Sequence, residues 1–206
     1  MPRRRPGGLK GRIALLHAVA HIELNAIDLA WDFIARMAPL SPPVALFDDW
    51  VSVGADEARH FLSLAARLEQ LGARYGDLPA HDGLWEAAEN TADDPLARLA
   101  VVPLVLEARG LDITPAMMER LRRNGDPDSA DVLATIYREE IAHVAAGMRW
   151  FRYLCAQQNR EPVQAWRSLV RRYFGGQLKP PFNKEARRQA GFPDAFYADF
   201  DIVTDC

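Results

Sequence analysis

Residues 56–60 read DEARH, and residues 139–143 read EEIAH. Both stretches contain the pattern Glu-x-x-His, and residues three apart on an α-helix lie on one face, about one turn from each other. Around each stretch, apolar residues recur at three- and four-residue steps, which is the periodicity of a helix with one buried face. The two stretches therefore predict two helices that each direct a carboxylate and an imidazole into the protein core.

A single glutamate on an earlier apolar stripe precedes each of these pairs. Glu23 stands 34 residues before Glu57, and Glu107 stands 33 residues before Glu140, so the two halves of the chain share one layout. A carboxylate on an apolar stripe costs free energy unless a cation compensates its charge. One glutamate from each of two helices, with Glu-x-x-His from each of two others, is the ligand set of di-iron and di-manganese carboxylate bundles. The predicted metal ligands are Glu23, Glu57, His60, Glu107, Glu140 and His143.

The donor types favour two iron ions as the cofactor, with manganese as the alternative, because hard carboxylate oxygens suit both metals and imidazole suits iron. Asp56 and Glu139 stand four residues before the two histidines. Each could accept the outer N–H of an imidazole, on its own helix or across the bundle, or could be a solvated carboxylate. Arg59 is a further candidate beside the ligands, although the second motif has Ala142 at the matching place. Tyr137, one turn before Glu140, could hydrogen-bond a ligand, although an aromatic residue at such a position is more often part of the core.

His17 and His21 form a second histidine pair. At 100° per residue, His21 points about 160° away from Glu23 on the same helix. We therefore expect this pair to serve helix packing or the surface, and His81 to be a polar loop residue.

Helical periodicity runs through most of the chain. The expected helices cover residues 12–38, 43–73, about 95–123, 128–157 and 162–174. The third is expected to kink at Pro103 and to restart near Thr114-Pro115. Residues 74–93 read as a long crossover with a short helix around 84–89, and an irregular tail follows Gly175-Gly176. The prediction is a single all-α domain over 1–206, a four-helix bundle at about 12–157 with an extra C-terminal helix and tail at 160–206.

Two cysteines, Cys155 and Cys206, cannot build a disulfide framework or a four-cysteine knuckle. We see neither a signal segment nor a run of about 20 apolar residues, so a cytoplasmic protein without a membrane segment is expected. Basic residues cluster at 1–12 and at 160–188, where aromatic residues are interleaved. Such a segment could track a nucleic-acid backbone, but we prefer the solvated face of an amphipathic helix with a packed tail.

Five strings together resemble a ferritin-like family of unknown function: HIELNAIDLAWD, DEARHF, EARGLDITP, EEIAHVAAGMRWF and KPPFNKEARRQAGF. The resemblance covers nearly the whole chain and implies a ferritin-like four-helix bundle with the same six ligands. More distantly, the layout is similar to the tRNA-(2-methylthio-isopentenyl-adenosine) hydroxylase, a di-iron oxygenase. DEARH is also similar to the DExRH of di-iron hydrocarbon monooxygenases, in which the Asp and Arg support the ligands.

Two functions stay open at this point. The first is an oxygen-activating oxidoreductase that hydroxylates a small molecule or a modified nucleoside, with an external electron donor because the chain has no iron–sulfur or flavin motif. The second is a ferroxidase or another iron- or peroxide-handling protein. For the first, we expect a substrate pocket lined by Trp50, Phe61, Tyr137 and Phe151. The oligomeric state is left open.

Overall fold

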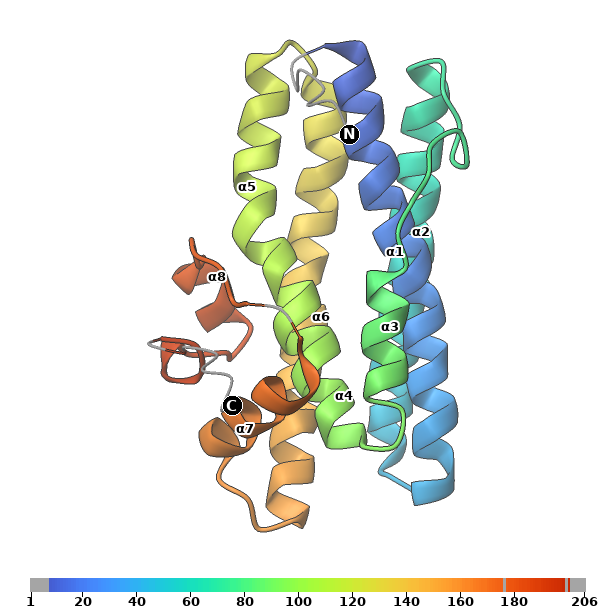
Figure 1. Ribbon diagram of the computed structural model, residues 1–206. Helices are drawn as coiled ribbons and strands as arrows, with labels where there is room; N and C mark the ends of the chain where they lie inside the picture. Colours follow the sequence, from blue (N-terminus) through green and yellow to red (C-terminus); the bar gives the residue numbers. More distant parts are fainter. Residues whose placement is uncertain (1–7, 176, 199, 201–206) are drawn as a thin grey trace.

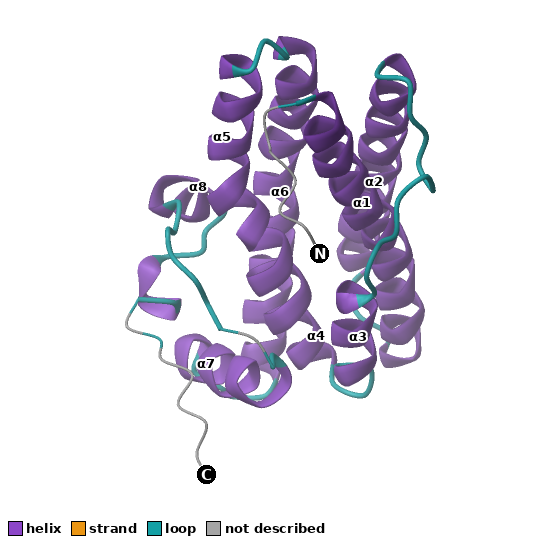
Figure 2. Ribbon diagram, turned by 45° about the horizontal axis from the view of Figure 1, so that its top comes forward, coloured by secondary structure: helices purple, strands orange, loops and turns teal. Residues whose placement is uncertain are grey.

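The computed structural model describes residues 8–175, 177–198 and 200, and these residues form helices, turns and loops with no strand among them. The predicted all-α class is confirmed, and Figure 2 shows helices throughout the body of the protein. Arg3, Arg4 and Arg5 of the first basic cluster lie outside the described residues, and so does Cys206.

Two antiparallel helix pairs form the bundle (Figure 1). The first pair is α1 (Leu9–Met37), a short 3₁₀ turn η1 (Ala38–Leu40) and α2 (Val44–Gln70). The second pair is α4 (Pro95–Val101), the π-helical segment η2 (Val102–Glu107), α5 (Ala108–Arg123) and α6 (Pro127–Gln157). A crossover containing α3 (Gly83–Asn90) runs back along the bundle, so that α2 and the α4–α5 helix point the same way (Figure 1).

Local sequence signals start these helices where they were expected. Asp94 caps α4 by accepting hydrogen bonds from the backbone N–H groups of Leu96 and Ala97, and Pro95 occupies the first turn. Asp126 caps α6 in the same way through the N–H of Ser129. A side-chain acceptor at the cap satisfies backbone donors that the first turn leaves unpaired.

The third helix changes pitch instead of restarting at Thr114-Pro115, so that part of the expectation is wrong. The pitch change is the π-helical segment η2, which begins just before Pro103. Pro115 lies inside α5, where its missing N–H leaves the carbonyl of Leu111 without its usual partner. Asn183 donates its Nδ2–H to that carbonyl over 3.1 Å, which allows the helix to continue.

The C-terminal segment is more ordered than the expected irregular tail. It contains α7 (Pro162–Tyr173) and α8 (Lys184–Gln189), which pack on the second helix pair, and the 3₁₀ turn η3 (Asp194–Phe196), which packs on α7 and α8. Trp166 is fully buried and donates to the carbonyl of Ala100, just before the π-helical segment. Arg187 pairs with the buried Asp112 over 2.7 Å, just after that segment. The tail therefore holds the bundle on both sides of η2.

This packing uses two of the aromatic and basic residues that a nucleic acid would need, whereas Arg171, Arg172 and Lys179 are exposed. Trp166 is buried and cannot stack on a base. Arg167 donates to the carbonyls of Ala195, Phe196 and Ala198 within the tail. The contacts favour the reading of this segment as a helix face with a packed tail.

The segment Leu9–Leu40 is long and apolar enough to cross a membrane by length and composition. A core helix of a bundle meets the same criteria. In the structure, α1 packs along α2 and buries Leu16, Leu29 and Phe33 together with the ionisable side chain of Glu23.

The second histidine pair joins the crossover to α1. His17 Nε2 accepts hydrogen bonds from the backbone N–H groups of Gly76 (2.9 Å) and Leu78 (3.4 Å), and the His17 ring stacks on Tyr75. His21 Nδ1 lies 2.8 Å from the hydroxyl of Tyr75. The expected packing role fits these contacts.

We predict that His17 makes the stability of the protein depend on pH. Burial lowers the pKa of His17, the charge of His21 adds to this, and Asp77 opposes it. Because the unfolded chain binds this proton more readily, His17 destabilises the fold as the pH falls below about 6.5, the usual value for histidine. Denaturant unfolding from pH 8 to pH 5 should show a shallower acid loss for His17→Gln than for the wild type. Parallel curves would contradict this assignment.

Candidate metal centre

Four carboxylates and two imidazoles meet between the two helix pairs. Glu57 lies between the imidazoles, with Oε2 3.2 Å from Nδ1 of His60 and Oε1 3.1 Å from Nδ1 of His143. Glu140 Oε1 also faces both, at 3.5 Å from His143 Nδ1 and 3.9 Å from His60 Nδ1. Two carboxylates in this position can bridge a pair of cations, one beside each imidazole.

The two lone glutamates flank this group. Glu23 Oε2 lies 3.2 Å from Nδ1 of His60, and the ligand atoms of Glu23, Glu57, His60 and Glu140 all lie within 4.8 Å of one another. Glu107, from the π-helical segment, borders the same cavity as the other three glutamates. The structure therefore brings all six predicted residues to one region of the bundle.

Burial and mutual repulsion act on the carboxylates of this group. Burial raises the pKa of Glu107 well above its usual value, and the neighbouring Glu140 and Glu57 raise it further. Burial likewise raises the pKa of Glu23 well above its usual value and raises the pKa of Glu140. Each of these shifts shows that the cluster resists additional negative charge.

The histidines and Glu57 show the complementary effect. Burial alone would lower the pKa of His60, but Glu23 and Glu57 raise it to about 10. Glu140 and Glu57 overcome the effect of burial on His143 and raise its pKa to about 12. Burial alone would raise the pKa of Glu57, but the two imidazoles lower it to about 2. The interior of the group thus favours positive charge, which a divalent cation provides while displacing the imidazole protons.

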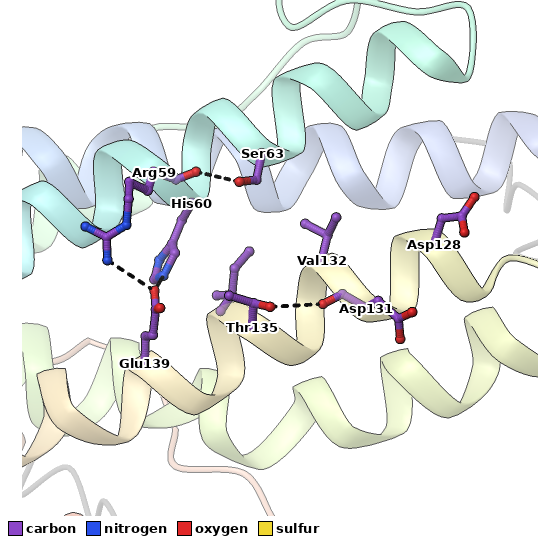
Figure 3. Close-up of a pocket in the computed structure, with 9 residues that line it drawn as sticks. Arg59, His60, Ser63, Asp128, Asp131, Val132, Thr135 and Glu139 are labelled. Atoms are coloured by element: carbon purple, nitrogen blue, oxygen red, sulfur yellow. Dashed lines mark hydrogen bonds and ion pairs between the residues drawn. The ribbon is translucent and has the colours of Figure 1, made fainter.

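The outer nitrogens of the imidazoles are held by carboxylates from the opposite helix. His60 Nε2 on α2 lies 2.7 Å from Glu139 on α6, and His143 Nε2 on α6 lies 3.1 Å from Asp56 on α2. Arg59 hydrogen-bonds Asp56 and lies 3.6 Å from Glu139, as Figure 3 shows for the latter pair. Both expected acceptors are present, and both act across the bundle. A carboxylate on Nε2–H leaves Nδ1 to face the centre.

Several buried atoms of the group have no hydrogen-bond partner among the described residues. They are Oε2 of Glu107, Oε2 of Glu140, Oε1 of Glu57 and Nδ1 of His143. Buried polar atoms are almost always paired, and unpaired ones mark a strained, catalytic or ion-binding position. These atoms all belong to the predicted ligands, so four carboxylates and two imidazoles fit a metal pair in donor type and in unmet bonding capacity.

Tyr137 packs against the hydrophobic core, which is the second of the two roles considered for it. Its hydroxyl accepts a hydrogen bond from Asn183 Nδ2 over 2.9 Å, so it contacts the tail, and no hydrogen bond joins it to a ligand among the described residues. The expected pocket lined by Trp50, Phe61, Tyr137 and Phe151 is wrong, and Phe61 packs edge-on against Tyr75. Trp50 and Phe151 are buried in the core, where they fill space between the helices. Helical periodicity shows that a side chain faces inward but not whether it lines a cavity.

A cavity of about 210 Å³ instead opens on the carboxylate side of the group, between α1, α5 and α6. Glu23, Glu57, Glu107 and Glu140 reach it, and most other residues that line it are apolar. The histidine side faces a different, open groove lined by Arg59, His60 and Glu139 (Figure 3).

Sequence reasoning missed the contact that places Glu107. Gly147 of α6 faces Pro103, and a β-carbon at Gly147 would lie 2.5 Å from the Pro103 Cβ. Real Cβ atoms do not approach this closely, so glycine is required where α6 crosses η2. The sequence does hold a signal for this contact, since Pro103 stands four residues before Glu107 and Gly147 stands seven residues after Glu140.

Residues 1–198 match the family described as "Protein of unknown function (DUF455)". The chain belongs to the DUF455 family. An uncharacterized protein of Haemophilus influenzae is 39% identical over 197 residues, which cover 93% of this chain and 68% of the relative. No solved structure matches. Membership accounts for the resemblance of the five strings to a family of unknown function.

The ligand assignment predicts that His60→Ala and His143→Ala remove bound metal. Each loses one nitrogen donor, whereas the apolar core is kept, so the stability loss should be smaller than the roughly 2–5 kcal/mol of a buried Leu→Ala change such as Leu64→Ala. Elemental analysis and thermal unfolding of the purified variants measure both effects. His17→Ala and His21→Ala are the controls and should keep the metal. Unchanged metal content in both His60 and His143 variants would sink the assignment.

Proposed function

We propose that this DUF455 protein is a ferritin-like dinuclear non-haem iron protein that acts as an oxygen-activating oxidoreductase of the hydroxylase type. The observation that carries the proposal is the position of Glu57 and Glu140 between two imidazoles whose Nδ1 atoms face each other across them. Glutamates that bridge two histidine-bearing positions are the arrangement of dinuclear carboxylate bundles.

In this proposal, Glu23 and His60 would hold one metal ion, Glu107 and His143 would hold the other, and Glu57 and Glu140 would serve both. Asp56 and Glu139 orient the imidazoles, which fixes the nitrogen that each offers. The metal is proposed to be iron because two imidazoles among four carboxylates suit it, and manganese is the alternative.

A bound iron pair would supply the electrons that reduce dioxygen. The protein's own part would be to admit a substrate and surround it with apolar side chains, and the cavity on the carboxylate side is lined for this. The reducing equivalents would come from an external donor, since two cysteines cannot build an iron–sulfur cluster in this chain. A cytoplasmic location, where such donors and reduced iron are found, belongs to the same proposal.

One observation favours the runner-up, a ferroxidase or iron-handling role. The groove on the histidine side has a volume of about 360 Å³ and is lined by polar side chains that include Ser63, Asp128, Asp131 and Glu139 (Figure 3). Carboxylates and a hydroxyl can pass a hydrated cation toward His60. However, Asp128 and Asp131 already pair with Arg67 and Arg122, which lowers their capacity to attract iron.

The two functions differ in how the reduced protein uses oxygen. We expect a hydroxylase-type centre to bind about two irons per chain and then stop, because the ligand set holds one metal pair. Anaerobic reduction, mixing with oxygen and titration with excess ferrous iron measure this ratio. Glu57→Ala should abolish iron binding, and Glu69→Ala, an exposed glutamate on the same helix, should match the wild type.

A ferroxidase would give a different result in this titration. Sustained oxidation of excess ferrous iron, at a rate lost in Glu57→Ala and kept in Glu69→Ala, would overturn the hydroxylase reading and establish the runner-up. Two manganese ions in the protein as purified, with no iron, would change the metal of the proposal and keep its ligands.

A further inference from the structure

The cavity on the carboxylate side has an apolar wall and an ionisable floor. Its floor carries the four glutamates of the candidate centre. Its wall comes mainly from α1, α5 and α6 and includes Val19, Ile22, Ala26, Ile113, Met117 and Ile136. A molecule that enters the cavity therefore meets hydrocarbon side chains first and the candidate metal centre last.

The cavity is open at its rim. Ile22 and Ile113 line it and are 45% and 36% exposed, which is unusual for isoleucine and places an apolar edge in contact with solvent. Arg109 also lines it, but its Nη1 donates to the carbonyls of Lys179 and Pro181, which holds the guanidinium against the tail. The mouth is thus suited to an uncharged, apolar group.

The volume of the cavity limits the size of the apolar group that it can bind. An apolar cavity of about 150 Å³ can bind benzene, which has six carbons. At about 210 Å³, this cavity has room for roughly eight carbons by the same measure. A hydrated ion or a phosphate would gain little there, because the wall offers almost no hydrogen bonds.

We propose that this cavity binds the hydrocarbon part of the substrate, an uncharged aliphatic group of about eight carbons, with one end directed at the four glutamates. The chemical role of the cavity rests on the proposed function, because the bound group would present its C–H bonds to the metal pair. Its ability to bind such a group depends only on the cavity itself.

The probes for this proposal are unbranched primary alcohols from butanol to decanol, titrated calorimetrically into the purified full-length protein. Affinity should rise about fourfold for each added methylene, since each buries further apolar surface. The rise should level off at about eight carbons, where the chain fills the cavity. Iron content is measured on the same samples.

Gly110 offers a variant that fills the cavity without disturbing the helix. It lies on α5 and lines the cavity, and a β-carbon there would meet no atom within 4 Å. Leucine is also a better helix former than glycine, so Gly110→Leu should keep or raise the melting temperature. It should weaken octanol binding about tenfold or more, because its side chain takes the place of several methylenes. Gly110→Ala is the matched control and should keep most of the affinity.

The outcomes separate the cavity from the metal centre. Wild-type protein that fails to bind octanol, or folded Gly110→Leu that binds it as tightly as Gly110→Ala, would overturn the proposal. Protein that binds octanol in this Gly110-dependent way but binds neither iron nor manganese would support the cavity and reject the proposed function. Protein that binds iron but not octanol would reject the cavity proposal and leave the proposed metal centre standing.

Discussion

Four carboxylates gathered inside one apolar bundle are the constraint on which the rest of the structure depends. Moving a charged carboxylate out of water is costly, and four together also repel one another. The raised pKa values of Glu23, Glu107 and Glu140 express this cost, and the raised values of the two histidines show its compensation. A fold that retains such a group needs positive charge at its centre, and a metal pair supplies more of it than two imidazolium ions.

The surrounding helices hold the side chains of this group in position. Each helix of the Glu-x-x-His pair supplies the carboxylate that orients the histidine of the other, so α2 and α6 fix one another's imidazoles. On the opposite side, Glu107 depends on a π-helical segment that Gly147 contacts and the C-terminal tail brackets. The tail therefore belongs to the architecture of the site, although no hydrogen bond joins its described residues to the glutamates, and it holds Arg167 and Arg187 within the protein.

The sequence alone was sufficient where a pattern repeats. Two Glu-x-x-His motifs with matched spacing to a lone glutamate identified the six residues that meet in the bundle, because helical periodicity determines which residues share a face. It was insufficient where distant segments compensate a local defect. Pro115 reads as a helix break, yet Asn183, far along the chain, satisfies the carbonyl that Pro115 leaves unpaired. The pocket was misplaced for a similar reason, since periodicity shows that Trp50 faces inward but not which space it fills.

X-ray diffraction from crystals of the iron-loaded protein, recorded on both sides of the iron absorption edge, tests the central claim most directly. The account predicts two anomalous peaks about 3.5–4 Å apart, as in other two-metal centres. Glu57 and Glu140 should contact both peaks, Glu23 and His60 one of them, and Glu107 and His143 the other. A single peak, or two peaks with Glu107 turned away from both, would contradict the account.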